Sequence, residues 1–424
     1  MTKLKYILAL LLSLTTFAFA ENYDDDIYEE NEETYSSKQN YQQNLKKPSK
    51  KETKNPIFEG YILSEFYVDV LDTSKQKVQY NDSLTNSYLD LDALLKLNIG
   101  KGFYAETKWN LKPVNKRRYT GDIYAKNPGY IVGDSYDSDF YGKDNYVRRT
   151  FQFSSYGLGV ETLNINYKNS NLGIGLGKID PTFGSAFDKT RFSGVYGVVM
   201  PEEYELTEKL GAYISAIFPF GDLTFNIFYD DTTGLSNTMF KKQGRNKAKG
   251  GAGNTKKLNN FSLTFNGKFD NLTLNLGYRQ QESKLQYQEI ERGFVAGAEY
   301  LIELPYNLNI LPFAELAYFD NFDSMKSRDV AYLTLFLPAI YENWHFIVSN
   351  TTKYDYEKHY HNYTSYLTQL SVGYKFDFGL MIDVAKIWQR EAKKADGFAG
   401  LGPKDKWVHH KDCWAFMVSY LFKF

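Results

Sequence analysis

The chain has 424 residues, a formal net charge of −1 and a single cysteine, Cys413. The near-neutral balance gives no sign of a nucleic-acid partner, and one cysteine excludes an intrachain disulfide. Aromatic residues make up 17% of the chain, with 36 Tyr and 31 Phe, and no apolar run after the first twenty residues is long enough for a helical membrane span. Such a composition suits a transmembrane β-barrel, whose strands alternate polar and apolar residues.

Residues 1–20 predict export. The segment MTKLKYILALLLSLTTFAFA starts with two lysines, continues with an apolar stretch and ends in the pattern A-F-A. This is the layout of a secretory signal peptide, with cleavage expected after Ala20. A retained membrane anchor is the alternative, but the apolar run is short for a span of roughly 20 residues.

Residues 21–56 differ in composition from the rest of the chain. The first part, ENYDDDIYEENEE, is acidic, and the later part, KKPSKKETKNP, is basic. Neither part has apolar periodicity, so we expect a disordered, charged periplasmic segment.

From residue 57 onward the chain repeats one unit of alternating strand, turn, alternating strand and polar loop. Connections after even-numbered strands are short, for example GKG and DN, and those after odd-numbered strands are longer. This asymmetry is typical of outer-membrane barrels, with short periplasmic turns and long extracellular loops. About sixteen strands are predicted: 57–70, 86–99, 103–112, 155–167, 172–180, 209–219, 223–231, 259–269, 272–281, 291–303, 307–319, 329–339, 344–353, 364–377, 380–390 and 412–424.

Alternation alone does not decide whether the apolar face points inward, as in a soluble β-sandwich, or outward. A closed barrel of about 16 strands is too wide for side chains to fill and keeps an aqueous interior. The apolar face is therefore expected to meet lipid, while polar residues such as Lys96 and Lys108 face water. We predict an all-β fold for residues 57–424, a transmembrane antiparallel β-barrel of about 16 strands.

Glycines gather on two neighbouring strands just before the stretch 181–208. A glycine inside a strand often marks the close approach of another backbone, so these positions predict a seat for a loop that folds into the barrel. Ordinary strand irregularity is the alternative. A slip in the apolar phase also predicts a β-bulge near Glu161-Thr162. The proposed seat comprises Gly157, Gly159, Gly173, Gly175 and Gly177.

The last predicted strand ends at residue 424 with aromatic residues on one face, at Trp414, Phe416, Tyr420, Phe422 and Phe424. This pattern resembles the C-terminal assembly signal of Gram-negative outer-membrane proteins, which implies the barrel-assembly machinery as a partner. The sixteen-strand plan resembles the general diffusion porins. Pro181-Thr182-Phe183-Gly184 is similar to the Pro-x-Phe-Gly motif that begins the constriction loop of that family. The segment 21–56 departs from the family pattern.

The resemblance implies an outer-membrane porin, a water-filled channel for passive diffusion of small hydrophilic solutes and ions, narrowed by the inward loop 181–208. Acidic residues of this loop would face cations of the wall and set up a transverse field. The residues expected at this constriction are Lys96, Lys108, Asp180, Asp188, Arg191, Glu202 and Glu203. The loop 113–150 matches in position the loop that joins porin subunits, which implies a homotrimer. The basic loop 241–257 is a candidate for lipopolysaccharide phosphates.

Two other classes of function were weighed. A non-conducting adhesin or structural barrel would act through its outer loops and remains the alternative. An outer-membrane enzyme is not predicted, because none of the five histidines lies in a motif with a serine and an acid. No cofactor and no metal site are predicted either. The histidines are His345, His359, His361, His409 and His410.

Overall fold

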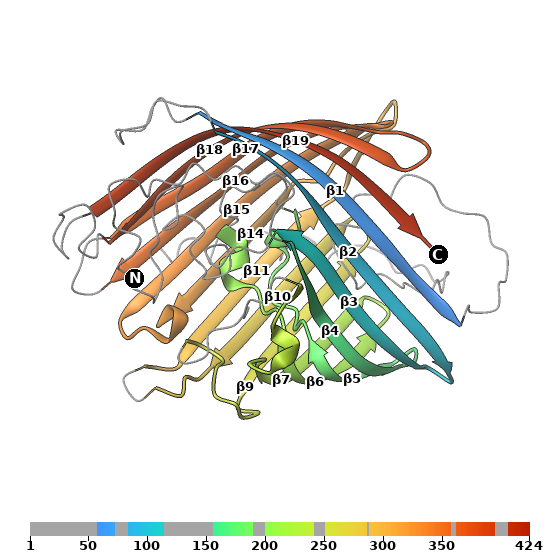
Figure 1. Ribbon diagram of the computed structural model, residues 1–424, viewed down its shortest axis with the longest axis vertical. Helices are drawn as coiled ribbons and strands as arrows, with labels where there is room; N and C mark the ends of the chain where they lie inside the picture. Colours follow the sequence, from blue (N-terminus) through green and yellow to red (C-terminus); the bar gives the residue numbers. More distant parts are fainter. Residues whose placement is uncertain are drawn as a thin grey trace, which may run out of the picture. The chain divides into compact units, whose positions relative to one another are not determined.

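Sixteen long antiparallel strands form one closed sheet in the computed structural model (Figure 1). The predicted count of sixteen is confirmed. The signal peptide and the charged segment 21–56 lie outside the described residues and remain predictions. The structure describes residues 57–72, 84–113, 156–189, 200–240, 251–285, 288–357, 362–394 and 406–424.

The strands follow one another around the barrel in chain order. Three short segments accompany the sixteen long strands: β8 (Met239–Phe240), β12 (Ile302–Leu304) and β13 (Leu308–Ile310). The long strands are β1 (Phe58–Asp72), β2 (Leu84–Gly100), β3 (Phe103–Pro113), β4 (Tyr156–Lys168), β5 (Leu172–Ile179), β6 (Lys209–Phe218), β7 (Gly221–Asp230), β9 (Asn260–Phe269), β10 (Leu272–Gln281), β11 (Glu291–Tyr300), β14 (Phe313–Asp320), β15 (Arg328–Tyr341), β16 (Trp344–Glu357), β17 (Tyr363–Lys375), β18 (Leu380–Lys394) and β19 (Lys406–Lys423).

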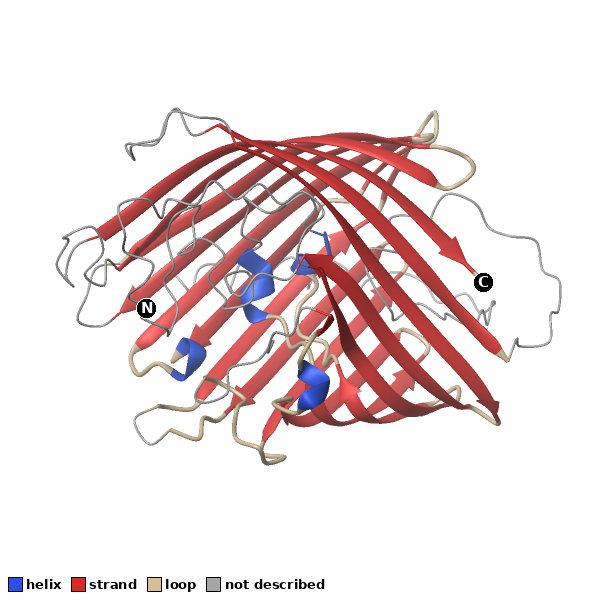
Figure 2. Cartoon of the chain, in the orientation of Figure 1, coloured by secondary structure: helices blue, strands red, loops and turns tan. Residues whose placement is uncertain are grey.

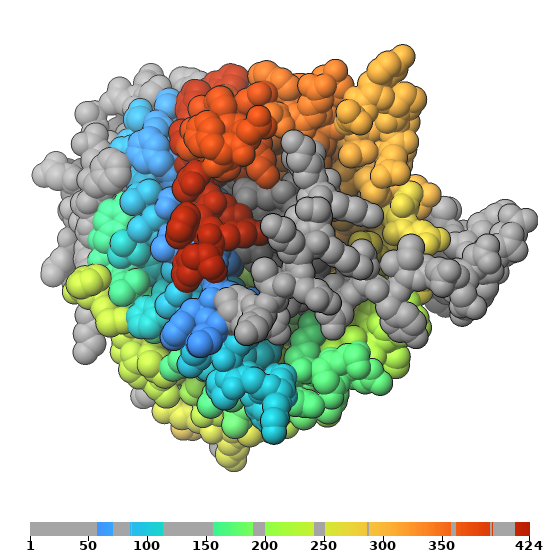
Figure 3. All heavy atoms as spheres, turned by 90° about the vertical axis from the view of Figure 1, so that its right-hand side faces the viewer, coloured from blue at the N-terminus to red at the C-terminus, as the bar shows by residue number. Residues whose placement is uncertain are grey.

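The first and last strands close the barrel. β1 pairs with β19 from Tyr61 opposite Lys423 to Asp72 opposite Asp412, and their surfaces lie side by side in blue and red in Figure 3. The amide of Gly60 also donates to the carbonyl of Phe424 at 2.9 Å. Closure removes the free edges of the sheet, so the backbone groups of the end strands are paired, as a hydrocarbon environment requires.

Each strand has one apolar outward face and one inward face. On β16, Trp344, Phe346 and Val348 are exposed, whereas the alternating His345 and Ser349 are buried. The same division holds along the other strands, because successive side chains point to opposite faces of a sheet. Many large aliphatic and aromatic side chains are exposed along the strands, and the buried set contains many acids, amides and hydroxyls. The outward face is therefore suited to lipid.

Tight turns join the strand pairs at one end of the barrel. In the turn between β2 and β3, Gly100, Lys101 and Gly102 have φ values of 107°, 54° and 84°. Glycine adopts this left-handed region without steric cost, so two of the three residues fit the turn directly. Asp270, in the turn between β9 and β10, also has a positive φ of 49°.

Two predicted strands are interrupted. The prediction 291–303 corresponds to β11 and β12, and the prediction 307–319 corresponds to β13 and β14. The breaks fall at Leu301 and at Leu311-Pro312, and proline cannot donate a backbone hydrogen bond to a neighbouring strand. The register between the two long strands is the same on both sides of the breaks, with Glu299 opposite Phe313 and Ile302 opposite Ile310.

Short helical segments lie inside the ring of strands (Figure 2). They are α3 (Ala186–Lys189) and the 3-10 helix η2 (Met200–Tyr204), both in the connection between β5 and β6. Two further 3-10 turns, η3 (Gly234–Ser236) and η4 (Phe322–Ser324), follow β7 and β14. Among the described residues, no helix is long and apolar enough to cross a membrane.

Candidate pore constriction

The chain leaves the wall after β5 and returns at β6. The two ends of this inward connection are held together, because the amide of Glu208 donates to Asp180 Oδ1 at 2.6 Å. Beside them, Lys178 Nζ lies 3.0 Å from Glu208 Oε2 and 3.2 Å from Asp231 Oδ2, and it also donates to the carbonyl of Leu235. Lys178 is only 1% exposed. A buried lysine with two carboxylates therefore ties both ends of the connection to the segment that follows β7.

That segment also completes the wall. β5 pairs with β4 only along residues 163–168 of β4. Beyond this region β8 pairs with β4, with Met239 opposite Leu158 and Phe240 opposite Gly157. The free edge that β5 leaves on β4 is thereby covered by the loop after β7.

The first half of the inward connection crosses to the far wall. Thr182 Oγ1 lies 2.9 Å from Thr264 Oγ1 of β9. The ring of Phe183 packs against Phe319 of β14, with centroids 5.9 Å apart. It also lies next to Gly277 of β10, where an added Cβ would meet the ring at 3.2 Å. Residues after β5 thus reach strands that lie several positions further around the barrel.

Glu315 of β14 is the main anchor of the connection. Its carboxylate accepts hydrogen bonds from the Ser185 amide at 2.6 Å, the Ser185 hydroxyl at 3.1 Å, the Ala186 amide at 3.2 Å and the Tyr204 hydroxyl at 2.7 Å. Glu315 is 1% exposed. Bonds to an ionised group are stronger than neutral ones, so this residue holds both halves of the connection against the far wall.

The second half makes its own contacts with that wall. Arg279 of β10 donates to the carbonyl of Tyr204 at 2.5 Å while its guanidinium pairs with Glu291 of β11. Glu203 accepts from the Tyr332 hydroxyl at 2.7 Å and forms an ion pair with Lys353 of β16. On the first half, Lys189 pairs with Glu299 of β11. The connection is therefore bound to strands β9, β10, β11, β14, β15 and β16.

The near wall carries the cations expected at the constriction. Lys96 lies 2.5 Å from Glu59 of β1, and Lys108 lies 2.7 Å from Glu161 of β4. The register between β3 and β4 shifts at Lys108, which leaves Glu161 as an extra residue between Val160 and Thr162. The predicted bulge near Glu161-Thr162 is confirmed, and it turns a carboxylate toward Lys108.

The charge of Lys108 influences the pKa values of two acids of the inward connection, Asp180 and Glu205. Surrounding protein desolvates Asp180 and raises its pKa to about 6, and the positive charge of Lys108 acts against that rise. Burial likewise raises the pKa of Glu205, with a further contribution from Asp188 and Glu202. Lys108 opposes this second rise as well. Lys108 is therefore near enough to Asp180 and Glu205 of the inward connection for its charge to favour their ionised forms.

The expected constriction residues do not all meet. Lys108, Asp180, Asp188 and Glu202 belong to one electrostatic neighbourhood. Glu203 does not face Lys96 or Lys108 as expected, because it points to the far wall and pairs there with Lys353. Lys96 is paired within its own wall. Arg191 lies outside the described residues.

The glycines of β5 have other neighbours than expected. An added Cβ on Gly175 would meet Tyr213 and Asn166 at 2.1 and 2.4 Å, and one on Gly173 would meet Ser215 first. Gly177 is closest to the backbone of β4, with the Leu163 carbonyl oxygen 2.4 Å from an added Cβ. These three glycines thus accommodate neighbouring strands rather than the inward connection. For Gly157 and Gly159, both buried, the seat remains a hypothesis.

The observed seat lies on the opposite wall and was not predicted. Gly277 accepts the ring of Phe183, and Gly293 and Gly297 leave room for Phe319 and Glu315. Gly277 and Gly297 lie between outward apolar residues, and Gly293 lies between the outward Arg292 and Phe294. A search of every strand for inward glycines would therefore have found all three. The partner of Glu315 could not be read from the sequence, because Ser185 lies 130 positions away.

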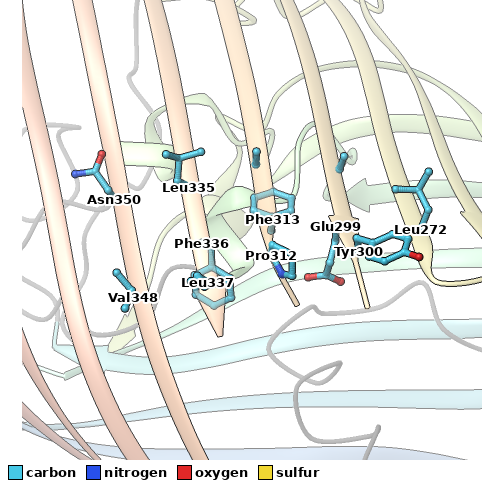
Figure 4. A pocket seen from close by; sticks show the side chains of 12 residues that line it. Leu272, Glu299, Tyr300, Pro312, Phe313, Leu335, Phe336, Leu337, Val348 and Asn350 are labelled. Atoms are coloured by element: carbon cyan, nitrogen blue, oxygen red, sulfur yellow. The ribbon is translucent and has the colours of Figure 1, made fainter. Parts of the chain in front are cut away.

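A separate hollow lies on the wall itself. A groove of about 560 Å³ is formed mostly by outward apolar side chains of β10, β11 and β14 to β16 (Figure 4). Ala298 and Ala314 are small, and Leu335, Leu337 and Val348 surround them. Because the groove is mostly on the outward face of the wall, it is a different feature from the inward connection, which lies inside the barrel.

Comparison with known proteins places the fold. No protein-family model matches the chain, and no curated protein matches it either. The outer membrane channel DcaP of Acinetobacter baumannii matches with a TM-score of 0.53 and 10% identity, over 86% of this chain and 96% of that one. OccAB3 of Acinetobacter baumannii matches at 0.48 with 12% identity over 87% and 99%. The trimer form of OmpT of Vibrio cholerae matches at 0.49 with 11% identity over 86% and 99%. The chain has the fold of an outer-membrane β-barrel.

Proposed function

We propose that this chain is an outer-membrane porin that forms a water-filled channel for passive diffusion of small hydrophilic solutes and ions. The connection between β5 and β6 narrows the channel. The observation that carries this proposal is the anchoring of Ser185, Ala186 and Tyr204 to Glu315 across the barrel. A loop fixed across the inside of a sixteen-stranded barrel reduces the aqueous cross-section that such a barrel would otherwise have.

The charges at this level support a role in ion passage. Lys108 on one wall and the acids Asp180, Asp188 and Glu202 on the connection set cation against anion. Opposed charges in a narrow, low-dielectric passage focus the field and orient dipolar solutes. This arrangement fits selection by charge and size.

The proposal also includes the start of the constriction loop, the oligomeric state, export and the assembly signal. The porin resemblance of Pro181-Thr182-Phe183-Gly184 fits the start of the inward connection, and the loop 113–150 corresponds in chain order to the loop that joins porin subunits. We propose a homotrimer in the outer membrane, exported with cleavage after Ala20. The aromatic residues expected to form the assembly signal are all exposed, where we propose that the barrel-assembly machinery recognises them. Trp414, Phe416, Tyr420 and Phe422 lie on β19, and Phe424 follows it directly.

Solute uptake tests the proposal. The mature protein is folded into liposomes, and swelling is followed in sugars of increasing size. Swelling with small sugars that falls off with size supports a diffusion channel. Liposomes that contain correctly folded protein and do not swell in any sugar would contradict it and favour a non-conducting adhesin or structural barrel.

A further inference from the structure

The outward wall of the barrel carries a cluster of polar side chains on β16 and β17. Asn350 donates through Nδ2 to Thr368 Oγ1 at 2.8 Å and accepts at Oδ1 from the Thr352 hydroxyl at 3.1 Å. Asn350 lies opposite the exposed Leu335 on one side and opposite Thr368 on the other. Directly opposite residues of neighbouring strands share a face of the sheet, and so do residues two apart on one strand. The three polar residues, which we call the amide cluster, therefore lie on the outward face.

Two aromatic residues of β16 give the height of the amide cluster. Trp344 and Tyr354 are exposed on the same outward face and lie ten residues apart. This is close to the 9–11 residues with which a tilted strand crosses the hydrocarbon layer, and aromatic girdles flank that layer at both interfaces. Asn350 is six residues from Trp344 and four from Tyr354. On the proposed outer-membrane placement, the amide cluster is within the hydrocarbon layer.

A polar group at this height is poorly matched to lipid. A side-chain amide has two N–H donors, and among the described residues the donor bond of the Asn350 side chain is the one to Thr368. The second N–H needs a partner that acyl chains do not offer. Other strands are apolar here: the outward residues near the middle of β6, β7 and β9 are Ile214, Phe225 and Leu263. The amide cluster is therefore a particular feature of the β16–β17 wall.

The amide cluster borders the outward groove described above (Figure 4). Asn350 lines this groove together with the exposed Leu335 and Val348 and the small Ala298 and Ala314. Within a membrane, small residues let another protein approach closely, and amide and hydroxyl groups hydrogen-bond across the contact. The wall thus combines room for the apolar side chains of a neighbour with a polar group that a neighbouring protein could satisfy.

We propose that this wall is a contact between copies of the chain, with the copies of Asn350 meeting at the symmetry axis of the assembly. The inference rests on the homotrimer in the proposed function and names the wall that faces its axis. Closed assemblies of identical chains arrange the same residue of each copy around one axis. Asparagine suits this position because its amide both donates and accepts, so its copies can hydrogen-bond to each other. A single Asn in an apolar contact sets the oligomeric state of coiled coils in the same way.

Cysteine cross-linking in outer membranes of cells that make the full chain tests this contact. Cys413→Ser first removes the buried native thiol. We then expect oxidation to link copies of Asn350→Cys, because a disulfide needs Cα atoms within roughly 7 Å, and a short bis-maleimide to link copies of Val348→Cys. Ile214→Cys, outward on β6 across the barrel, is the matched control and should link roughly tenfold less. If one of the two test variants does not fold, the other decides.

Asn350→Leu gives a second measurement. Leucine is compatible with lipid but removes the hydrogen bonds between copies, so the mature protein should associate roughly three- to thirty-fold more weakly. Ser64→Leu, at an outward position of β1, is the control and should associate as the unaltered protein does. Native mass spectrometry in detergent over a range of protein concentrations measures both.

The proposal is overturned if no linked product forms at residues 348 and 350, or if Asn350→Leu associates as before. A monomeric protein that retains phospholipid would also overturn it and would assign the groove to an acyl chain. Conductance is recorded in parallel, and it should not change, because Asn350 is on the outward face. A protein that conducts but does not link at these residues refutes the contact and leaves the channel proposal intact.

Discussion

The amide of Ser185 donates to Oε2 of Glu315 at 2.6 Å, although the two residues are 130 positions apart in the chain. Ser185 precedes the short helix of the inward connection, and Glu315 lies on β14 of the far wall. This bond fixes where the connection crosses the barrel, so changes at Glu315 should alter both the stability of the barrel and the width of its passage.

Glu315→Ala removes the anchor. The Ser185 and Ala186 amides and the Tyr204 hydroxyl lose a buried acceptor, so we expect the free energy of unfolding to fall by roughly 2–5 kcal/mol. Released from the wall, the connection should also leave a wider passage and a higher single-channel conductance. Denaturant titration and bilayer recording measure the two effects.

Glu315→Gln keeps one acceptor oxygen and should give intermediate values. Asp222→Asn is the control, because Asp222 accepts from Thr224 and Asn266 at the end of the barrel with the tight turns. If the Glu315→Ala variant is as stable as the control and conducts identically, Glu315 does not hold the connection.

Lys178→Met tests the buried cluster at the ends of the connection. Glu208 and Asp231 would lose their shared cation, and removing one partner of a buried ion pair costs about 3–5 kcal/mol. Lys96→Met breaks the more exposed pair with Glu59 and should cost about 1 kcal/mol or less. Equal denaturation midpoints for the two variants would show that the Lys178 cluster adds no stability.

Lys108→Gln tests the charge at the constriction. Loss of this cation leaves the acids of the connection less compensated, so the reversal potential in a salt gradient should move toward cation preference. Lys96→Gln should shift it less, because Lys96 is paired within its own wall. Unchanged reversal potentials in both variants would exclude these lysines from the selectivity of the channel.

Ion preference should depend on pH through Asp180. Desolvation raises the pKa of this carboxyl to about 6, so it is ionised well above that pH and protonated well below it. Loss of its negative charge as the pH falls through about 6 should lower the preference for cations. Asp180→Asn should remove this step from a plot of reversal potential against pH. A step of the same size in the variant would assign it to another group.

The barrel could be predicted well from the sequence, because the physical signal is local. Two-residue alternation in strands such as 89–99, glycine turns and an even strand count are enough to predict a wide, closed sheet with an apolar exterior. The bulge at Glu161 was also predictable, since one extra residue shifts the phase of alternation. The break in the strand at Leu311-Pro312, between β13 and β14, was not predicted, because the alternation of residues continues across it.

The site was predicted less completely, because its contacts are non-local. The stretch after β5 was correctly expected to turn inward, but its seat was assigned to Gly157 and Gly159 of β4 and to Gly173, Gly175 and Gly177 of β5. The observed seat at Gly277 is on the far wall. Which wall receives a loop depends on its reach and on partners such as Glu315, and periodicity carries no information about either.

Planar-bilayer recording of the purified mature protein across a salt gradient tests the central claim most directly. The account predicts discrete conductance steps, a reversal potential that moves toward cations in Lys108→Gln, and larger steps in Glu315→Ala. Correctly folded protein that inserts and stays silent, in the unaltered form and in Glu315→Ala alike, would contradict it.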